Sequence, residues 1–151
     1  MESQLIMNRA VIPTLIIISF LAEACKHKPD ESGTPAPVKP TVCVAGKGGK
    51  VIIFSYALHG GKTISNYYTH LDTAFVKYGT TFSPGTNPAD YDTFFIGDLG
   101  DEHIHCAGLK CGDYFIYRTA WDSTAGITRY GGLGITFTDT TGDKIVNINV
   151  N

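Results

Sequence analysis

Alternation of hydrophobic and polar residues is the main pattern in the chain after residue 40. Successive side chains of a β-strand point to opposite faces. In the segment KIVNINV at 144–150, one face carries Val146, Ile148 and Val150, and the other carries Ile145, Asn147 and Asn149. This pattern predicts a strand with one buried face.

Short segments of the same kind recur, separated by turns rich in glycine. We predict further strands at Thr41–Ala45, Val51–Leu58, Asp72–Tyr78, Tyr91–Gly97, His103–Ala107, Asp113–Trp121 and Gly134–Asp139, with a turn at Gly46–Gly49 after the first. Strands at this spacing favour a sandwich or a barrel. We therefore expect residues 41–151 to form one all-β domain, a β-sandwich of about seven to eight strands.

The N-terminal segment differs in composition and is predicted to be a targeting segment. An apolar run from Ala10 to Leu21 follows Arg9, and Ala22 and Ala24 fit a small-residue cleavage site. We expect residues 1–24 to be a signal peptide; an uncleaved membrane anchor is the alternative. Residues 26–40 are polar and contain four prolines, so 25–40 is expected to be a disordered linker.

Cys25 stands directly after the predicted cleavage site. This arrangement resembles the lipobox of bacterial lipoproteins, in which such a cysteine is acylated, although Ala22 stands where that pattern has leucine. The resemblance implies lipidation of Cys25 and a membrane as a partner through the lipid anchor. Ordinary secretory cleavage at the same bond is the alternative, and it would give a secreted protein.

The segment GLKCGDY at 108–114 has the form of a tyrosine corner. In immunoglobulin-like sandwiches, a tyrosine at the start of a late strand bonds to the backbone of the preceding corner. We expect Leu109 to fill the core, Gly112 to adopt a conformation that other residues avoid, and Tyr114 to be buried.

Several segments together resemble a known group of proteins. They are GKGGK, HGGKTI, DTAFVKY, GLKCGDYFIY, the Trp121-Asp122 pair and RYGGLGITF, in this order. The chain resembles small lipoproteins of the Bacteroidota of unassigned function, which have a transthyretin-like or carboxypeptidase-regulatory-like β-sandwich. The departure is Cys111, where lysine or proline is expected. The resemblance implies an Ig-like or transthyretin-like sandwich in the cell envelope, most simply at the outer membrane on either face, and it implies no reaction.

The cysteines leave several pairings open. If Cys25 is lipidated, Cys43, Cys106 and Cys111 remain, and one of these stays free or pairs between chains. If Cys25 is not lipidated, all four are available. A buried Cys106 in the place of an apolar residue is the simplest interpretation of that residue.

Two further groups of residues are candidates for binding. His103 and His105 share one face of a predicted strand, but closed metal sites need four ligands, so we expect solvent-facing histidines, no metal and no cofactor. Phe115, Tyr117 and Trp121 share the face opposite Tyr114 and form an outward aromatic stripe. Such a stripe suits a glycan or a partner protein; the alternative is that the loops around Phe82 or Arg129 cover it.

The remaining features narrow the function classes. A net charge of −2 gives no electrostatic signature of nucleic-acid binding. The sequence contains no G-x-S-x-G, H-E-x-x-H or P-loop motif. We expect a non-enzymatic, envelope-anchored binding or accessory module whose partner is a glycan or an envelope protein. The alternative is a structural subunit that assembles through a sheet edge or a free cysteine.

Overall fold

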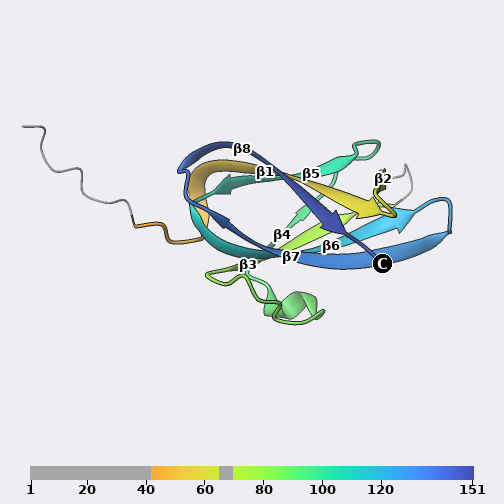
Figure 1. The fold of residues 1–151 in the computed structure, drawn as a ribbon, viewed down its shortest axis with the longest axis horizontal. Helices are drawn as coiled ribbons and strands as arrows, with labels where there is room; N and C mark the ends of the chain where they lie inside the picture. Colours follow the sequence, from red (N-terminus) through yellow and green to blue (C-terminus); the bar gives the residue numbers. More distant parts are fainter. Residues whose placement is uncertain (1–41, 65–69) are drawn as a thin grey trace, which may run out of the picture. The chain divides into compact units, whose positions relative to one another are not determined.

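The alternating segments form strands, as Figure 1 shows for the computed structural model, which describes residues 42–64 and 70–151. The elements are β1 (Lys47–His59), β2 (Lys62–Ile64), β3 (Thr73–Tyr78), the 3-10 helix η1 (Pro88–Asp90), β4 (Thr93–Ile96), β5 (His103–Leu109), β6 (Gly112–Asp122), β7 (Ile127–Phe137) and β8 (Thr141–Asn149). They form two packed sheets, which confirms the predicted all-β sandwich of seven to eight strands.

Sheet A is built around the long strand β1. Strand β5 pairs antiparallel with residues 47–56 of β1, and β2 pairs antiparallel with residues 57–59. Strand β8 pairs with β1 in parallel, from Lys50 opposite Thr141 to Leu58 opposite Asn149. The last strand of the domain is therefore held by the first.

Sheet B has the antiparallel order β4-β3-β6-β7. The two sheets meet at one edge, where the backbones of Tyr130 in β7 and Asn151 after β8 exchange hydrogen bonds of 2.9 and 3.2 Å. Gly131 allows this approach, because a Cβ there would lie 2.0 Å from the Asn149 carbonyl oxygen. Glycine at this position is therefore required for the C-terminus to close the sandwich.

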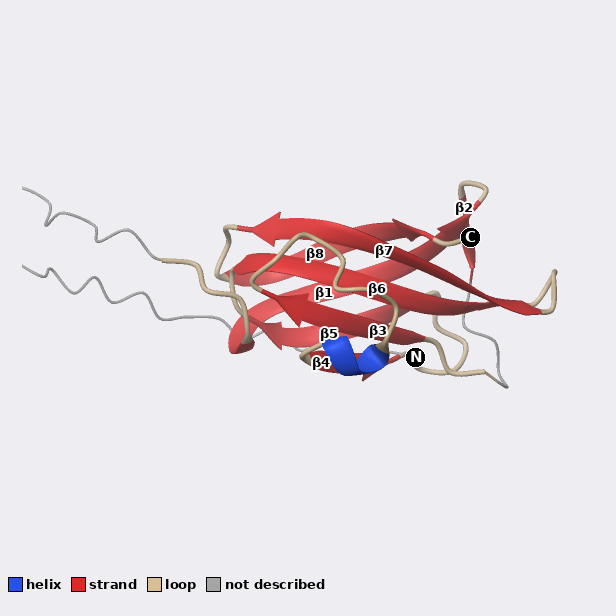
Figure 2. Cartoon of the chain, turned by 90° about the horizontal axis from the view of Figure 1, so that it is seen from below, coloured by secondary structure: helices blue, strands red, loops and turns tan. Residues whose placement is uncertain are grey.

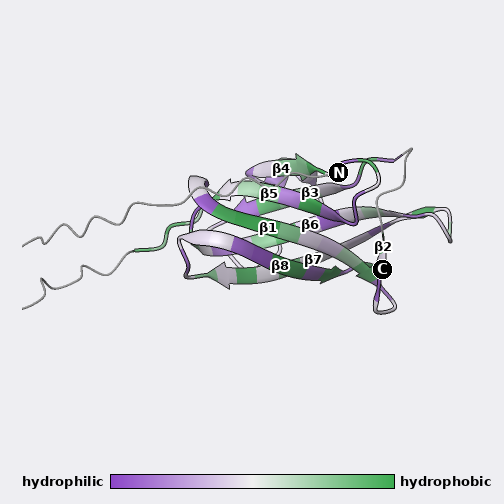
Figure 3. Ribbon diagram, turned by 90° about the horizontal axis from the view of Figure 1, so that it is seen from above, coloured by the Kyte–Doolittle hydropathy of each residue, from purple (hydrophilic) through white to green (hydrophobic). Residues whose placement is uncertain are grey.

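The core lies between the inward faces of the sheets. Its fully buried side chains come from alternate positions of the strands, and Figure 3 shows hydrophobic and hydrophilic residues alternating along them. The main contributors are Val51, Ile53, Val76, Ile104, Cys106, Leu109, Tyr114, Ile116 and Ile148. This alternation is the reason that the strands could be recognised in the sequence.

The loop between β3 and β4 lies across the outer side of sheet B, as Figure 2 shows. A Cβ at Gly134 would lie 2.0 Å from the Thr81 carbonyl oxygen, so the loop rests directly on the backbone of β7. The Tyr91 hydroxyl donates to the Gly85 carbonyl oxygen over 2.7 Å and holds the loop together. The β3–β4 loop therefore covers the outer face of sheet B around Gly134.

Some predicted boundaries were wrong. Residues 42–45 form no strand, and Gly48 and Gly49 lie inside β1 rather than in a turn. The pairing of β1 with β5 shifts register at this point, and a Cβ at Gly49 would lie 2.0 Å from the Leu109 carbonyl oxygen. These glycines therefore belong to an irregular part of β1 that packs closely against β5. Glycine-rich composition alone does not distinguish such a strand from a turn.

Strand β7 begins at Ile127 rather than at Gly134, and β2 was not predicted. The predicted signal peptide, Cys25 and the linker lie outside the described residues. Within 42–64 and 70–151, no helix has the length and apolar character that a membrane crossing requires.

Candidate functional site

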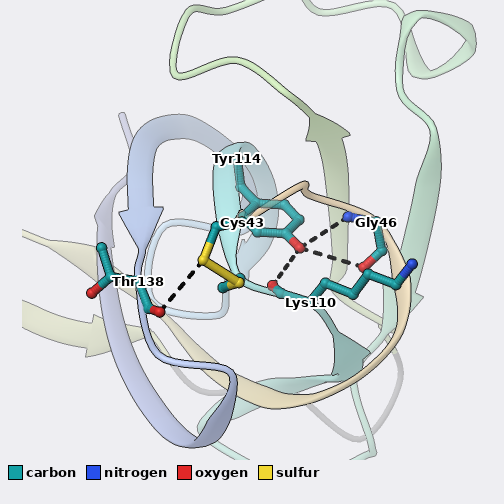
Figure 4. Close-up of a disulfide and its surroundings, with 6 residues drawn as sticks. Cys43, Gly46, Lys110, Tyr114 and Thr138 are labelled. Atoms are coloured by element: carbon teal, nitrogen blue, oxygen red, sulfur yellow. Dashed lines mark hydrogen bonds between the residues drawn. A yellow bond between two sulfur atoms is a disulfide. The ribbon is translucent and has the colours of Figure 1, made fainter. Parts of the chain in front are cut away.

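The tyrosine corner joins the start of β6 to the segment before β1. Tyr114 is fully buried, and its hydroxyl donates to the Lys110 carbonyl oxygen over 2.7 Å and accepts from the Gly46 amide over 3.1 Å (Figure 4). Leu109 is buried in the core. Gly112 has a φ of +141°, and a Cβ there would lie 2.4 Å from the Ala45 nitrogen. The three predicted corner residues therefore hold two distant segments together.

A disulfide reinforces this corner. Cys43 and Cys111 are bonded, 68 residues apart in the chain, and Figure 4 shows the bond beside Tyr114. Cys106 is a free thiol in the core, and burial raises the pKa of this thiol to about 12. It occupies the place of an apolar residue and cannot reach a partner's thiol while the domain is folded.

The predicted aromatic stripe does point away from the core, but it is not uniformly exposed. Phe115 is only 8% exposed, and its ring lies over Gly132, where a Cβ would be 2.5 Å from the ring. The idea of Phe115 as an exposed contact is therefore wrong, because the β3–β4 loop also covers this end of β7. Tyr117 and Trp121 are half-buried, and the Trp121 ring stacks on His70 at 3.9 Å.

Tyr117 is the centre of a larger group of rings on the outer side of sheet B, which we call the aromatic face. Its members are Phe75, Tyr91, Phe94, Tyr117 and Tyr130. The ring of Tyr117 is nearly parallel to that of Tyr130, at 13° and 6.3 Å, and inclined by 26° to that of Tyr91, at 5.9 Å. The strand register creates this group, because Phe75 lies opposite both Phe94 and Tyr117.

Exposure distinguishes the members of the aromatic face. Phe94 is 58% exposed and Tyr130 is 49% exposed, whereas Tyr91 is buried. Burial raises the pKa of Tyr91 and of Tyr117 above the ordinary tyrosine value, so both hydroxyls are neutral at physiological pH. The exposed rings of Phe94 and Tyr130 are therefore free to stack against a ligand.

Sequence reasoning found Tyr117 but missed Phe75, Tyr91, Phe94 and Tyr130. Phe94 precedes Phe95, which packs against the core, so the signal was present in β4; Tyr130 stands between Arg129 and Gly131, so β7 carried no such signal there. The closeness of Phe94 and Tyr130 to Tyr117 depends on which strands pair, and this is not encoded in any single segment. Tyr91 was predicted as the first residue of a strand, but it follows η1 in a loop, because β4 begins at Thr93.

His103 and His105 share the outer face of sheet A, with a distance of 2.6 Å between their Nε2 atoms. In the described residues, no group of three or more histidine, cysteine, aspartate or glutamate side chains is arranged to hold a metal ion.

Comparisons with known proteins do not assign this chain to a family. No protein-family model matches the chain. The searches of curated proteins and of solved structures likewise find no match.

Proposed function

We propose that this protein is a non-enzymatic binding module of the bacterial cell envelope and that the aromatic face of sheet B is its ligand surface. The observation that carries the proposal is the exposure of large apolar side chains beside a partly buried ring cluster. Phe94, Ile96 and Tyr130 are each about half exposed, at 58%, 52% and 49%. They lie on the outer side of sheet B, from β4 at one edge to β7 at the other, and exposed apolar side chains of this size support a contact surface.

The chemistry of this surface favours a neutral partner. Lys77 and Asp92 lie beside the rings, but they pair with each other at 3.1 Å. Thr73 and Thr119 lie in register with each other between Ile96 and Tyr130 and add hydroxyl groups. Aromatic rings with neighbouring hydroxyls suit the apolar faces and hydroxyl groups of a glycan chain, which we propose as the ligand; an apolar patch on an envelope protein is the competing partner.

The disulfide supports the proposed location. Disulfides persist in oxidising compartments outside the cytosol, and Cys43–Cys111 stabilises the point at which the chain enters the domain. We propose that Cys25 carries a lipid anchor in the outer membrane and that the following linker holds the domain away from the bilayer. Secretion without lipid is the alternative.

Affinity electrophoresis in gels that contain a neutral polysaccharide tests the ligand surface. We expect one or more polysaccharides to retard the protein, and we expect Tyr117→Ala and Tyr130→Ala to reduce affinity at least about tenfold, which corresponds to the loss of one substantial contact. Trp121→Ala tests whether the surface extends along β6. Ile145→Ala is the matched control, because Ile145 is 72% exposed on sheet A.

Two results would count against this function. Retardation that is unchanged in the tyrosine variants would place the ligand elsewhere. The absence of retardation by every polysaccharide, together with binding of an envelope protein that the same tyrosine variants abolish, would replace the glycan with a protein partner.

The edge strand β4 supports a second candidate, a structural subunit. Strand β4 is short and lies at the end of sheet B, and its side chains Phe94 and Ile96 are exposed. A sheet edge of this kind can pair with another chain. Sedimentation analysis of the protein and of Ile96→Lys separates the two candidates, because an assembly through β4 would dissociate in the variant.

A further inference from the structure

The outer face of sheet A carries a histidine pair whose ring nitrogens converge. His103 and His105 alternate in β5 with Ile104 and Cys106, which are fully buried. The two imidazole rings stack at 17° with centroids 4.6 Å apart. Their Nε2 atoms are 2.6 Å apart, so the lone pair of at least one nitrogen points toward the other ring.

Two aromatic residues of the neighbouring strand hold these rings. Phe54 lies opposite His105 in the sheet, and Tyr56 lies opposite His103. The Phe54 ring meets both imidazoles edge-on, at 4.9 and 5.2 Å, and the Tyr56 ring lies 5.0 Å from that of His103. The aromatic rings restrict the rotamers of both histidines, so the convergence is built into the sheet.

We propose that His103 and His105 chelate a late divalent transition-metal ion through their Nε2 atoms, with Cu²⁺ bound most tightly and water in the remaining coordination positions. Metal–imidazole bonds are about 2.0–2.1 Å long, so two nitrogens in neighbouring coordination positions lie about 3 Å apart. The observed separation of 2.6 Å requires the rings to open by only a few tenths of an ångström. When the ion binds, the proton between the two Nε2 atoms moves to Nδ1 of its own imidazole or to solvent, and both Nε2 lone pairs coordinate the ion.

The donor set determines the class of metal. Imidazole nitrogens suit copper, nickel and zinc rather than calcium or magnesium, which take oxygen ligands. A given nitrogen site binds Cu²⁺ more tightly than Ni²⁺ or Zn²⁺, and Cu²⁺ accepts a tetragonal arrangement of nitrogen and water. A closed zinc site needs four protein ligands, and the described residues offer no group of three or more here. The site is therefore open to solvent and independent of the aromatic face.

Titration of the purified protein with Cu²⁺, followed by electron paramagnetic resonance, tests this site. The protein carries His27→Gln, because His27 is the third residue after the predicted cleavage site and competes for Cu²⁺ if the chain begins at Cys25. We expect one Cu²⁺ per chain, with hyperfine structure from two nitrogens. His103→Gln and His105→Gln should each weaken binding at least about tenfold and remove the two-nitrogen pattern.

His59→Gln is the control, because the His59 ring contacts the Val150 carbonyl oxygen at 2.9 Å on another part of the sheet. It should leave affinity within about twofold. Ca²⁺ should not displace Cu²⁺, and added Cu²⁺ should raise the melting temperature of the parent but not of the two histidine variants. An unchanged spectrum and affinity in His105→Gln would overturn the proposal, as would the lack of saturable binding by the parent.

Discussion

Arg118 and Asp72 form an ion pair that is closed off from solvent between the two sheets. The Arg118 Nη2 atom lies 3.4 Å from Asp72 Oδ2, and the side chains are 0% and 2% exposed. Arg118 also donates through Nη1 to the Ser55 carbonyl oxygen of β1, and Asp72 accepts the Trp121 amide over 2.9 Å. A side chain of sheet B thus binds the backbone of sheet A, and its counter-ion holds the end of β6.

Removing the charge of Asp72 should destabilise the domain strongly. In Asp72→Asn, the Arg118 guanidinium remains buried without its counter-ion, which costs about 3–5 kcal/mol. Urea unfolding measures this change. Lys77→Met is the control, because the Lys77–Asp92 pair is about one-third exposed and should contribute no more than about 1 kcal/mol.

The companion variant Arg118→Met in the Asp72→Asn background removes the unpaired charge. It should be more stable than Asp72→Asn alone, because the asparagine still accepts the Trp121 amide. A double variant that is less stable than the single one would show that the guanidinium contributes through its bond to Ser55 rather than through the ion pair.

Loss of the Tyr114 hydroxyl should weaken the corner. Tyr114→Phe leaves the Gly46 amide and the Lys110 carbonyl oxygen without their buried partner, and an unsatisfied buried group costs about 1–3 kcal/mol. Thermal unfolding measures the loss. Tyr130→Phe removes a hydroxyl from a half-exposed ring and should change stability by less than half as much; equal effects would mean that the corner bonds are not responsible.

The sequence was sufficient to predict the fold class and the positions of most strands because alternation is a local signal. It placed β6 almost correctly, at Asp113–Trp121 against the observed Gly112–Asp122. The sequence did not indicate which residue forms an ion pair with Arg118. Asp72 becomes that partner only because β3 pairs with β6 so that Ala74 lies opposite Arg118.

The same limit applies to the candidate sites. The corner was recognisable because its residues lie within one short segment. The pairing of Cys43 with Cys111 and the gathering of Phe94 and Tyr130 around Tyr117 depend on contacts between distant segments. The covering of Phe115 by the loop around Phe82 was one of two alternatives that the sequence left open, because the path of a loop has no periodicity that would decide between them.

Opening the disulfide should reduce stability substantially. Cys43 and Cys111 are separated by 68 residues, and closing a loop of this length contributes about 4 kcal/mol in the chain-entropy model. We expect Cys43→Ala/Cys111→Ala to lower the urea midpoint accordingly. A midpoint within experimental error of the parent would show that the corner is held by Tyr114 alone.

The free thiol should report on global unfolding. Cys106 is fully buried, and burial raises its pKa to about 12, so the reactive thiolate is scarce as well as inaccessible. Iodoacetamide should leave Cys106 unmodified in the native domain and modify it in denaturant, as peptide mass spectrometry would show. Rapid modification under native conditions would contradict the buried position.

A side chain at Gly134 should displace the loop that covers Phe115. In Gly134→Ala, the new Cβ would meet the backbone of Thr81, and β7 remains paired with β6. We expect faster proteolytic cleavage within residues 79–92 and greater solvent exposure of Phe115, with a cooperative unfolding transition retained. Thr128→Ala, at an exposed position of β7, should not change the cleavage rate.

The pairing of Asp122 with Arg129 should make the β6–β7 turn sensitive to acid. Arg129 Nε donates to Asp122 Oδ2 over 2.7 Å, and the Thr124 and Ala125 amides donate to Oδ1. The bond from Arg129, followed by these amides, holds the pKa of Asp122 below its ordinary value.

Because the pKa of Asp122 is lower in the folded state, this carboxylate adds stability above the unfolded pKa of about 3.9. That stability is lost as the pH falls through the folded pKa. Asp122→Asn should therefore be less stable than the parent at about pH 7, and the difference should shrink as the pH falls from the unfolded pKa through the folded one. Urea midpoints across this acid range measure it. In the Arg129→Met background the same substitution should have a smaller effect at about pH 7; an undiminished effect would assign the stabilisation to the turn amides alone.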